Sequence, residues 1–178
     1  MVLTNYLLKK EIQKLIRKAS ERPHQFRSLN EIKHILFICD SKDWTIIRGC
    51  IEKLKSLNKI VHTAILATSS KDVPTWYSNY MLLRSDRDVD LLGFPESAFQ
   101  KQFYNLPADL LIDFTSSQSS PLYYMSLKHP STFKAGIKYS EESVYDFSII
   151  PTEDRINLRF LFDELINYLT TINSKTGD

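Results

Sequence analysis

Short apolar runs along the chain predict β-strands. Each run is bounded by polar or turn-forming residues, as is typical of strands buried on both faces of a parallel sheet. The runs cover residues 34–39, 60–66, 109–114, 133–139 and 145–150. Apolar and polar positions alternate in 133–139, which predicts a place near the edge of the sheet.

Between these runs, apolar residues recur at the spacing of amphipathic helices. The pattern predicts helices over residues 3–20, 44–57, 121–128 and 154–173. Asp43 is expected to cap the second of these helices with its side chain. Ser120 followed by Pro121 favours a helix start, since serine is a good cap and proline lacks an amide that would be unpaired there.

The alternation of strands and helices predicts an α/β fold. We expect a Rossmann-like three-layer sandwich of about five mostly parallel strands, with an extra N-terminal amphipathic helix. Residues 1–27 would form that basic helix and a linker, and residues 28–178 a single domain. Within the irregular stretch 67–106, residues 90–95 fit a short edge strand or a loop, and residues 96–103 fit a short helix.

Charge is distributed unevenly over the 178 residues, which sum to +2. Residues 1–27 hold seven basic and two acidic side chains, a balance of +5, so residues 28–178 sum to −3. A basic helix can contact a polyanion or a membrane surface. The solvated face of an ordinary docked helix has the same pattern, and we expect neither nucleic acid nor a membrane as partner.

Catalytic and cofactor-binding motifs are missing from the sequence. Neither the G-x-G-x-x-G fingerprint nor the P-loop occurs, and none of the four glycines falls in a predicted strand-to-helix turn. No G-x-S-x-G, H-E-x-x-H or Cys/His cluster is present. We therefore expect no metal and no cofactor, with Cys39 and Cys50 as reduced core residues.

The predicted carboxyl ends of two strands hold the best candidates for a ligand site, because ligands of open parallel sheets bind there. Asp40 and Asp113 could approach each other to bind a metal or transfer protons. A small anionic ligand would also find hydroxyl and amino groups nearby. The candidates are Asp40, Ser41, Lys42, Asp113, Thr115, Ser116 and Ser119. Alternatively, these side chains only cap helices and close loops.

Large aromatic residues are concentrated in the stretch 74–83. Trp76, Tyr77 and Tyr80 fit a lid, or a surface for a protein partner or a second copy of the chain. The other interpretation is that these rings cover the sheet. No apolar run approaches the roughly 20 residues of a membrane span, so we expect a soluble cytoplasmic protein.

Two resemblances depend on the block D-L-L-I-D at 109–113, with F-K-A-G-I at 133–137 and the later Tyr145-Asp146. These residues resemble a small bacterial family of uncharacterised proteins of unknown function, over most of the chain. The block is also similar to the N-terminal half of heptosyltransferase-type glycosyltransferases. Those enzymes pair two Rossmann-like domains across a cleft, so this resemblance implies the fold and not transferase activity.

These observations favour a non-catalytic binding or protein-interaction module. The alternative is a small enzyme that acts on an anionic or sugar-like substrate at the carboxyl ends of the strands. A third hypothesis has the basic helix 3–20 contacting a membrane surface or nucleic acid.

Overall fold

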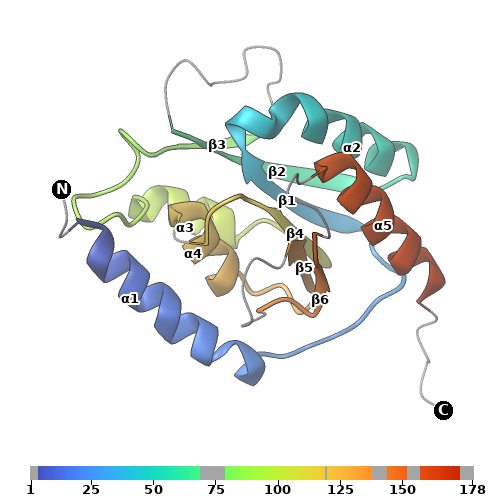
Figure 1. Ribbon diagram of the computed structural model, residues 1–178, viewed down its shortest axis with the longest axis horizontal. Helices are drawn as coiled ribbons and strands as arrows, with labels where there is room; N and C mark the ends of the chain where they lie inside the picture. Colours follow the sequence, from blue (N-terminus) through green and yellow to red (C-terminus); the bar gives the residue numbers. More distant parts are fainter. Residues whose placement is uncertain (1–3, 69–78, 119, 138–143, 152–156, 173–178) are drawn as a thin grey trace.

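The sheet of the computed structural model is open and entirely parallel (Figure 1). The structure describes residues 4–68, 79–118, 120–137, 144–151 and 157–172. Within them the strands are β1 His34–Asp40, β2 Ile60–Ala67, β3 Met81–Arg84, β4 Leu110–Phe114, β5 Lys134–Ile137 and β6 Phe147–Ile149. Their order, β3-β2-β1-β4-β5-β6, is that of a Rossmann-like sheet, so the predicted fold class is confirmed.

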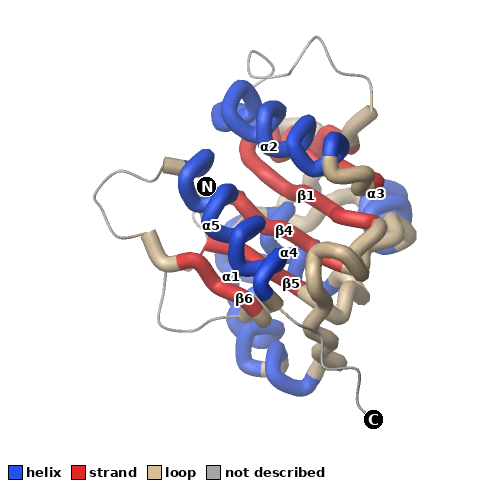
Figure 2. Tube along the Cα trace, turned by 90° about the vertical axis from the view of Figure 1, so that its right-hand side faces the viewer, coloured by secondary structure: helices blue, strands red, loops and turns tan. Residues whose placement is uncertain are grey.

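Helices cover both faces of the sheet (Figures 1 and 2). The described helices are α1 Thr4–Arg17, α2 Trp44–Ser56, α3 Ser97–Tyr104, α4 Pro121–Lys128 and α5 Leu158–Thr171. One face packs against α2 and α5, the other against α3 and α4, and α1 lies against α4. No helix in the described part of the chain is long and apolar enough to cross a membrane.

The central strands have the buried pattern that their sequence predicts. Every residue of β4 is buried, and successive residues of β1 alternate between the two core clusters: Ile35 and Phe37 face α2 and α5, whereas Leu36 faces α4. Helix α4 begins as predicted, since the Ser120 hydroxyl accepts a hydrogen bond from the Tyr123 amide.

Two local expectations were wrong, and one strand was missed. Strand β5 lies next to the edge strand β6, as predicted, but it does not have the expected polar face, because all four of its residues, Lys134 included, are buried. Asp43 makes no side-chain cap, since the 3-10 turn Ser41–Asp43 leads into α2. Strand β3 was not expected at all, and its four residues are too short a run to show a strand period.

The stretch 90–95, left open between a strand and a loop, is a turn with one isolated antiparallel bridge between Val89 and Pro95. The Asp90 carboxylate closes this turn by accepting hydrogen bonds from the amides of Leu92 and Phe94.

The N-terminal segment is tied to the far edge of the sheet. Leu8 and Ile12 of α1 are buried, 1% and 2% exposed. After α1, Arg22 and His24 both bind the carboxylate of Asp146, which also accepts a hydrogen bond from the Lys134 amide. Arg22 donates further to the carbonyls of Thr132 and Val144. These bonds hold the chain that follows α1 beside β5 and the start of β6.

Candidate binding site

The first candidate region is the place where the strand order reverses, between β1 and β4. Chain connections leave the sheet there in opposite directions, and ligands of doubly wound sheets bind in the resulting crevice. Strand β1 ends in Asp40, and β4 carries Asp113 one residue before its end. We call this group, together with the loop residues 115–118, the rim.

The Asp113 carboxylate is buried and accepts hydrogen bonds from groups of the same chain. The side chain is 1% exposed. One carboxylate oxygen accepts from the Thr115 amide (2.9 Å) and the Thr115 hydroxyl (2.7 Å), and the other accepts from the Ser126 hydroxyl (2.9 Å). Burial raises the pKa of Asp113, while these bonds and one from the Tyr145 side chain oppose the shift. This carboxyl group connects the rim loop to α4 and is closed to solvent.

Asp40 joins the two strands across the point of reversal. Its carboxylate accepts from the Ser116 amide (2.8 Å) and the Ser116 hydroxyl (2.5 Å). Lys42 donates to the same hydroxyl at 2.9 Å. Ser41 is 8% exposed and lies in the 3-10 turn before α2. Each carboxylate of the rim therefore binds a different residue of one loop, Thr115 for Asp113 and Ser116 for Asp40.

The rim as described is a loop-closing network. Within the residues that the structure describes, no group of three or more His, Cys, Asp or Glu side chains could hold a metal ion. Lys42 and Ser116 are exposed and could still meet an anion from solvent. The remaining rim candidate, Ser119, lies outside the described residues.

A buried lysine next to the rim was missed by the sequence analysis. Lys134 is 2% exposed, and its amino group donates to the carbonyls of Ser126 (2.8 Å) and Leu127 (3.0 Å) near the end of α4. Burial lowers the pKa of Lys134 to about 7, and the nearby Arg22 acts in the same direction. A lysine in a pattern that fits an edge strand gives no sequence signal for this position.

The second candidate region is the edge of the sheet formed by β2 and β3, which we call the β2 edge. Strand β3 begins opposite Ala64, so residues 60–63 of β2 have no strand partner on that side among the described residues. A cavity of about 400 Å³ lies here. It is lined by Val61, His62, Thr63, Asn79, Tyr80, Met81 and Leu106.

Two polar atoms at the β2 edge are buried without a hydrogen-bond partner in the described structure: Thr63 Oγ1 and His62 Nε2. Thr63 is only 3% exposed. Burying a hydroxyl without a partner costs roughly 1–3 kcal/mol, so most buried polar groups are paired. The unpaired atoms beside a cavity therefore mark a place where a ligand group would be favourable.

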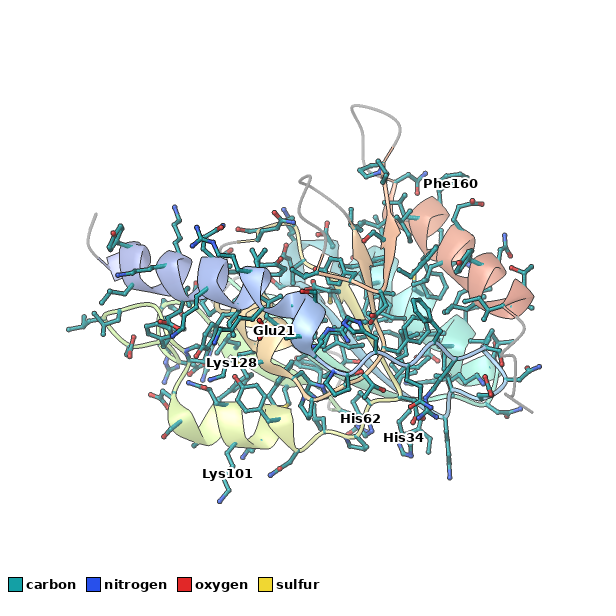
Figure 3. All side chains as sticks on the ribbon, turned by 90° about the horizontal axis from the view of Figure 1, so that it is seen from below. Glu21, His34, His62, Lys101, Lys128 and Phe160 are labelled. Carbon is teal, nitrogen blue, oxygen red and sulfur yellow. The ribbon has the colours of Figure 1, made fainter. Side chains whose placement is uncertain are left out.

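His62 lies beside a second histidine (Figure 3). Its ring stacks on that of His34, with centroids 5.8 Å apart and planes 6° from parallel. Burial, with a smaller contribution from His34, lowers the pKa of His62. A neutral imidazole at neutral pH can accept or donate a hydrogen bond at Nε2, depending on its tautomer.

Of the aromatic candidates, the structure describes Tyr80 alone; Trp76 and Tyr77 lie outside the described residues. The Tyr80 ring contacts Trp44 of α2, with centroids 5.8 Å apart. Tyr80 also lines the cavity at the β2 edge. Tyr80 therefore covers part of the sheet and borders the cavity, while its role in a lid or a partner surface stays a prediction.

Comparison with known proteins gives one match. A family model matches residues 5–172, and it describes a family of unknown function (DUF6913). No curated protein and no solved structure matches the chain. The match agrees with the resemblance to an uncharacterised family, while the comparisons add nothing to the resemblance to heptosyltransferase-type enzymes.

Proposed function

The chain belongs to this family of unknown function, and we propose that it is a non-catalytic protein-interaction module that binds an extended segment of a partner protein at the β2 edge. The observation that carries the proposal is the mismatch in strand length. β2 has eight residues and β3 has four, so the first half of β2, beside a cavity, has no strand partner on that side among the described residues.

Main-chain groups at this edge point outward. The Ile60 amide points toward β1, where it donates to the Lys33 carbonyl. The Ala67 carbonyl points away from β1 and accepts from the Ser85 amide. Because peptide groups alternate in direction along a strand, those of Val61 and Thr63 are directed to the open side. An added strand would pair with them, as in peptide recognition by strand addition.

The cavity can accept a side chain of such a segment. Val61 and Tyr80 pack toward one core cluster, and Met81 and Leu106 toward the other, so the cavity wraps around the edge of the sheet. Successive side chains of an added strand point to opposite faces, so one apolar side chain would contact Val61 and Tyr80 and the next would contact Met81 and Leu106. A polar group on the same segment would find Thr63 Oγ1 and His62 Nε2 without partners in the described structure.

The rim supports the alternative, a small enzyme, less well. Asp40 and Asp113 are the carboxylates predicted to transfer protons, and the bonds of Asp113 to Thr115 and Ser126 leave it closed to a substrate. The enzyme hypothesis then depends on the exposed Lys42 and Ser116. It predicts stabilisation by sugar phosphates that Lys42→Ala abolishes.

The test is a selection of random displayed peptides on the immobilised full chain. Selected peptides should bind the Tyr80→Ala variant about tenfold more weakly. They should bind the Phe160→Ala variant, which changes an exposed aromatic residue of α5, as well as the wild type. Amide exchange is the second measurement: a bound peptide should slow exchange at Val61 and Thr63. Peptides that bind Tyr80→Ala as well as wild type, or that protect amides only elsewhere, would contradict the proposal.

A further inference from the structure

A surface separate from the β2 edge carries a second inference. Helix α1 buries Leu8 and Ile12 against the body of the protein. Residues four or seven apart share a helix face, so Tyr6, Lys10 and Arg17 lie together on the opposite, outward face. Tyr6 is 61% exposed and the neighbouring Leu7 is 40% exposed. Helix α1 therefore exposes both cationic and apolar side chains to solvent.

The cations of α1 surround a shallow hollow of about 650 Å³. It is lined by Lys10, Glu11, Gln13, Lys14, Arg17 and Lys18. Four positive side chains thus face one carboxylate, and Glu11 is 3.6 Å from Lys14 across an exposed ion pair. A pair this exposed contributes little to stability, and the residues that line the hollow carry a net charge of +3.

The loop that joins β3 to α3 passes close to the N-terminal half of α1, as Figures 1 and 3 agree, and it has an apolar tip. Leu91 is 85% exposed and Leu92 is 43% exposed. The Asp90 carboxylate fixes the tip by accepting from two of its amides. Phe94, which follows, packs edge-on against Tyr124 of α4, the helix on which α1 lies.

We propose that the α1 face and the 91–92 tip together bind the surface of an anionic phospholipid bilayer. The cations would meet lipid headgroups, and the two leucines with Tyr6 and Leu7 would enter the boundary between headgroups and acyl chains. Stable peripheral binding needs two such signals, electrostatic and apolar. Nucleic acid would use the cations but not the exposed leucines, so a bilayer fits the whole surface better.

Sedimentation of the full chain with lipid vesicles tests the proposal. Binding should require phosphatidylserine in phosphatidylcholine vesicles and weaken as salt rises. The triple change Lys10→Gln, Lys14→Gln, Arg17→Gln should weaken binding about fivefold per cation removed. Its control makes the same charge change on other faces, with Lys33→Gln, Arg48→Gln and Lys101→Gln, and should bind like wild type.

The apolar contribution needs its own pair of variants. Leu91→Ser with Leu92→Ser should weaken vesicle binding about tenfold, whereas Ile46→Ser with Phe160→Ser, exposed residues of α2 and α5, should not. Circular dichroism confirms that each variant is folded. Equal binding to vesicles without phosphatidylserine would overturn the proposal. Unchanged vesicle binding by the double leucine variant would also overturn the proposal. If that variant bound RNA through the same cations as well, the surface would be a nucleic-acid site instead.

Discussion

Two buried threonines show how differently the rim and the β2 edge are built. Thr115 and Thr63 are each 3% exposed, and both lie on or next to a central strand. The Thr115 hydroxyl donates to Asp113 at 2.7 Å. The Thr63 hydroxyl is without a partner in the described structure. The same residue type at the same burial therefore stabilises the fold in one region and costs stability in the other.

The difference separates polar groups that the fold uses from polar groups that a ligand could use. At the rim, where a Rossmann-like sheet usually binds its ligand, Asp113 and Asp40 accept hydrogen bonds from the loop residues Thr115 and Ser116. At the β2 edge, the polar atoms are buried and unsaturated beside a cavity. Position in the fold alone would select the first region, while the hydrogen bonds select the second.

The largest expected loss of stability comes from a substitution that removes the hydrogen bonds of the rim. Asp113→Ala leaves the Thr115 amide and hydroxyl and the Ser126 hydroxyl without their acceptor in a buried place. Unsatisfied buried donors cost about 1–3 kcal/mol each, so we expect a loss of about 3 kcal/mol in the free energy of unfolding. Urea denaturation measures it, with the exposed Glu164→Ala as control. A loss below that of the control would show that the rim carboxylate is dispensable to the fold.

The buried lysine beside the rim predicts a pH dependence. Lys134 has a pKa of about 7 in the folded chain, and lysine in an unfolded chain titrates near 10.4. Between these values the unfolded state binds more protons, so the free energy of unfolding should rise with pH, by about 2 kcal/mol from pH 7 to pH 9.

Lys134→Met provides the comparison, because it removes the titrating group but keeps much of its volume. The rise attributable to Lys134 is the difference between wild-type and variant stability curves over that pH range. Curves that stay parallel would mean that the amino group is charged in the folded protein up to pH 9.

The same substitution at both threonines compares the rim and the β2 edge directly. Thr115→Val should destabilise by about 1–2 kcal/mol, because Asp113 loses a hydrogen bond. Thr63→Val removes a hydroxyl that has no partner among the described residues. The variant should be equally stable, or more stable by up to about 1 kcal/mol. Thermal and urea denaturation of both variants check the signs. Destabilisation at both sites would erase the distinction drawn between the two regions.

The smallest effect is expected at the exposed side of the rim. Ser116→Ala removes hydroxyl bonds to Asp40 and Lys42 but keeps the amide bond to Asp40. Since the side chain is exposed, water can replace the lost bonds, and we expect a loss of about 0.5 kcal/mol. Urea denaturation measures this loss. A loss larger than that of Asp113→Ala would show that Ser116, rather than Asp113, contributes most to the stability of the rim.

The sequence predicted the features that depend on long patterns. The apolar runs of β1, β2 and β4 and the stripes of α2 and α5 identified the α/β fold, and the strand ends brought Asp40, Asp113 and Ser116 into one region. Features that depend on neighbours in space were not predictable. Lys134 resembles an edge residue until α4 carbonyls cover it. Likewise, the β2 edge exists only because β3 is shorter than β2, so Thr63 resembled any polar strand residue.

The clamp of Arg22 and His24 on Asp146 also affects how the chain can fold during its synthesis. Arg22 precedes Asp146 by 124 residues, which a ribosome adds in about 6–25 s. Throughout that time, the carboxylate that Arg22 and His24 bind has not been made. Helix α4, which α1 contacts, also emerges late, so Leu8 and Ile12 remain uncovered on the nascent chain. We expect α1 to be the segment most open to chaperones, and docking of the N-terminus to be among the last steps of folding.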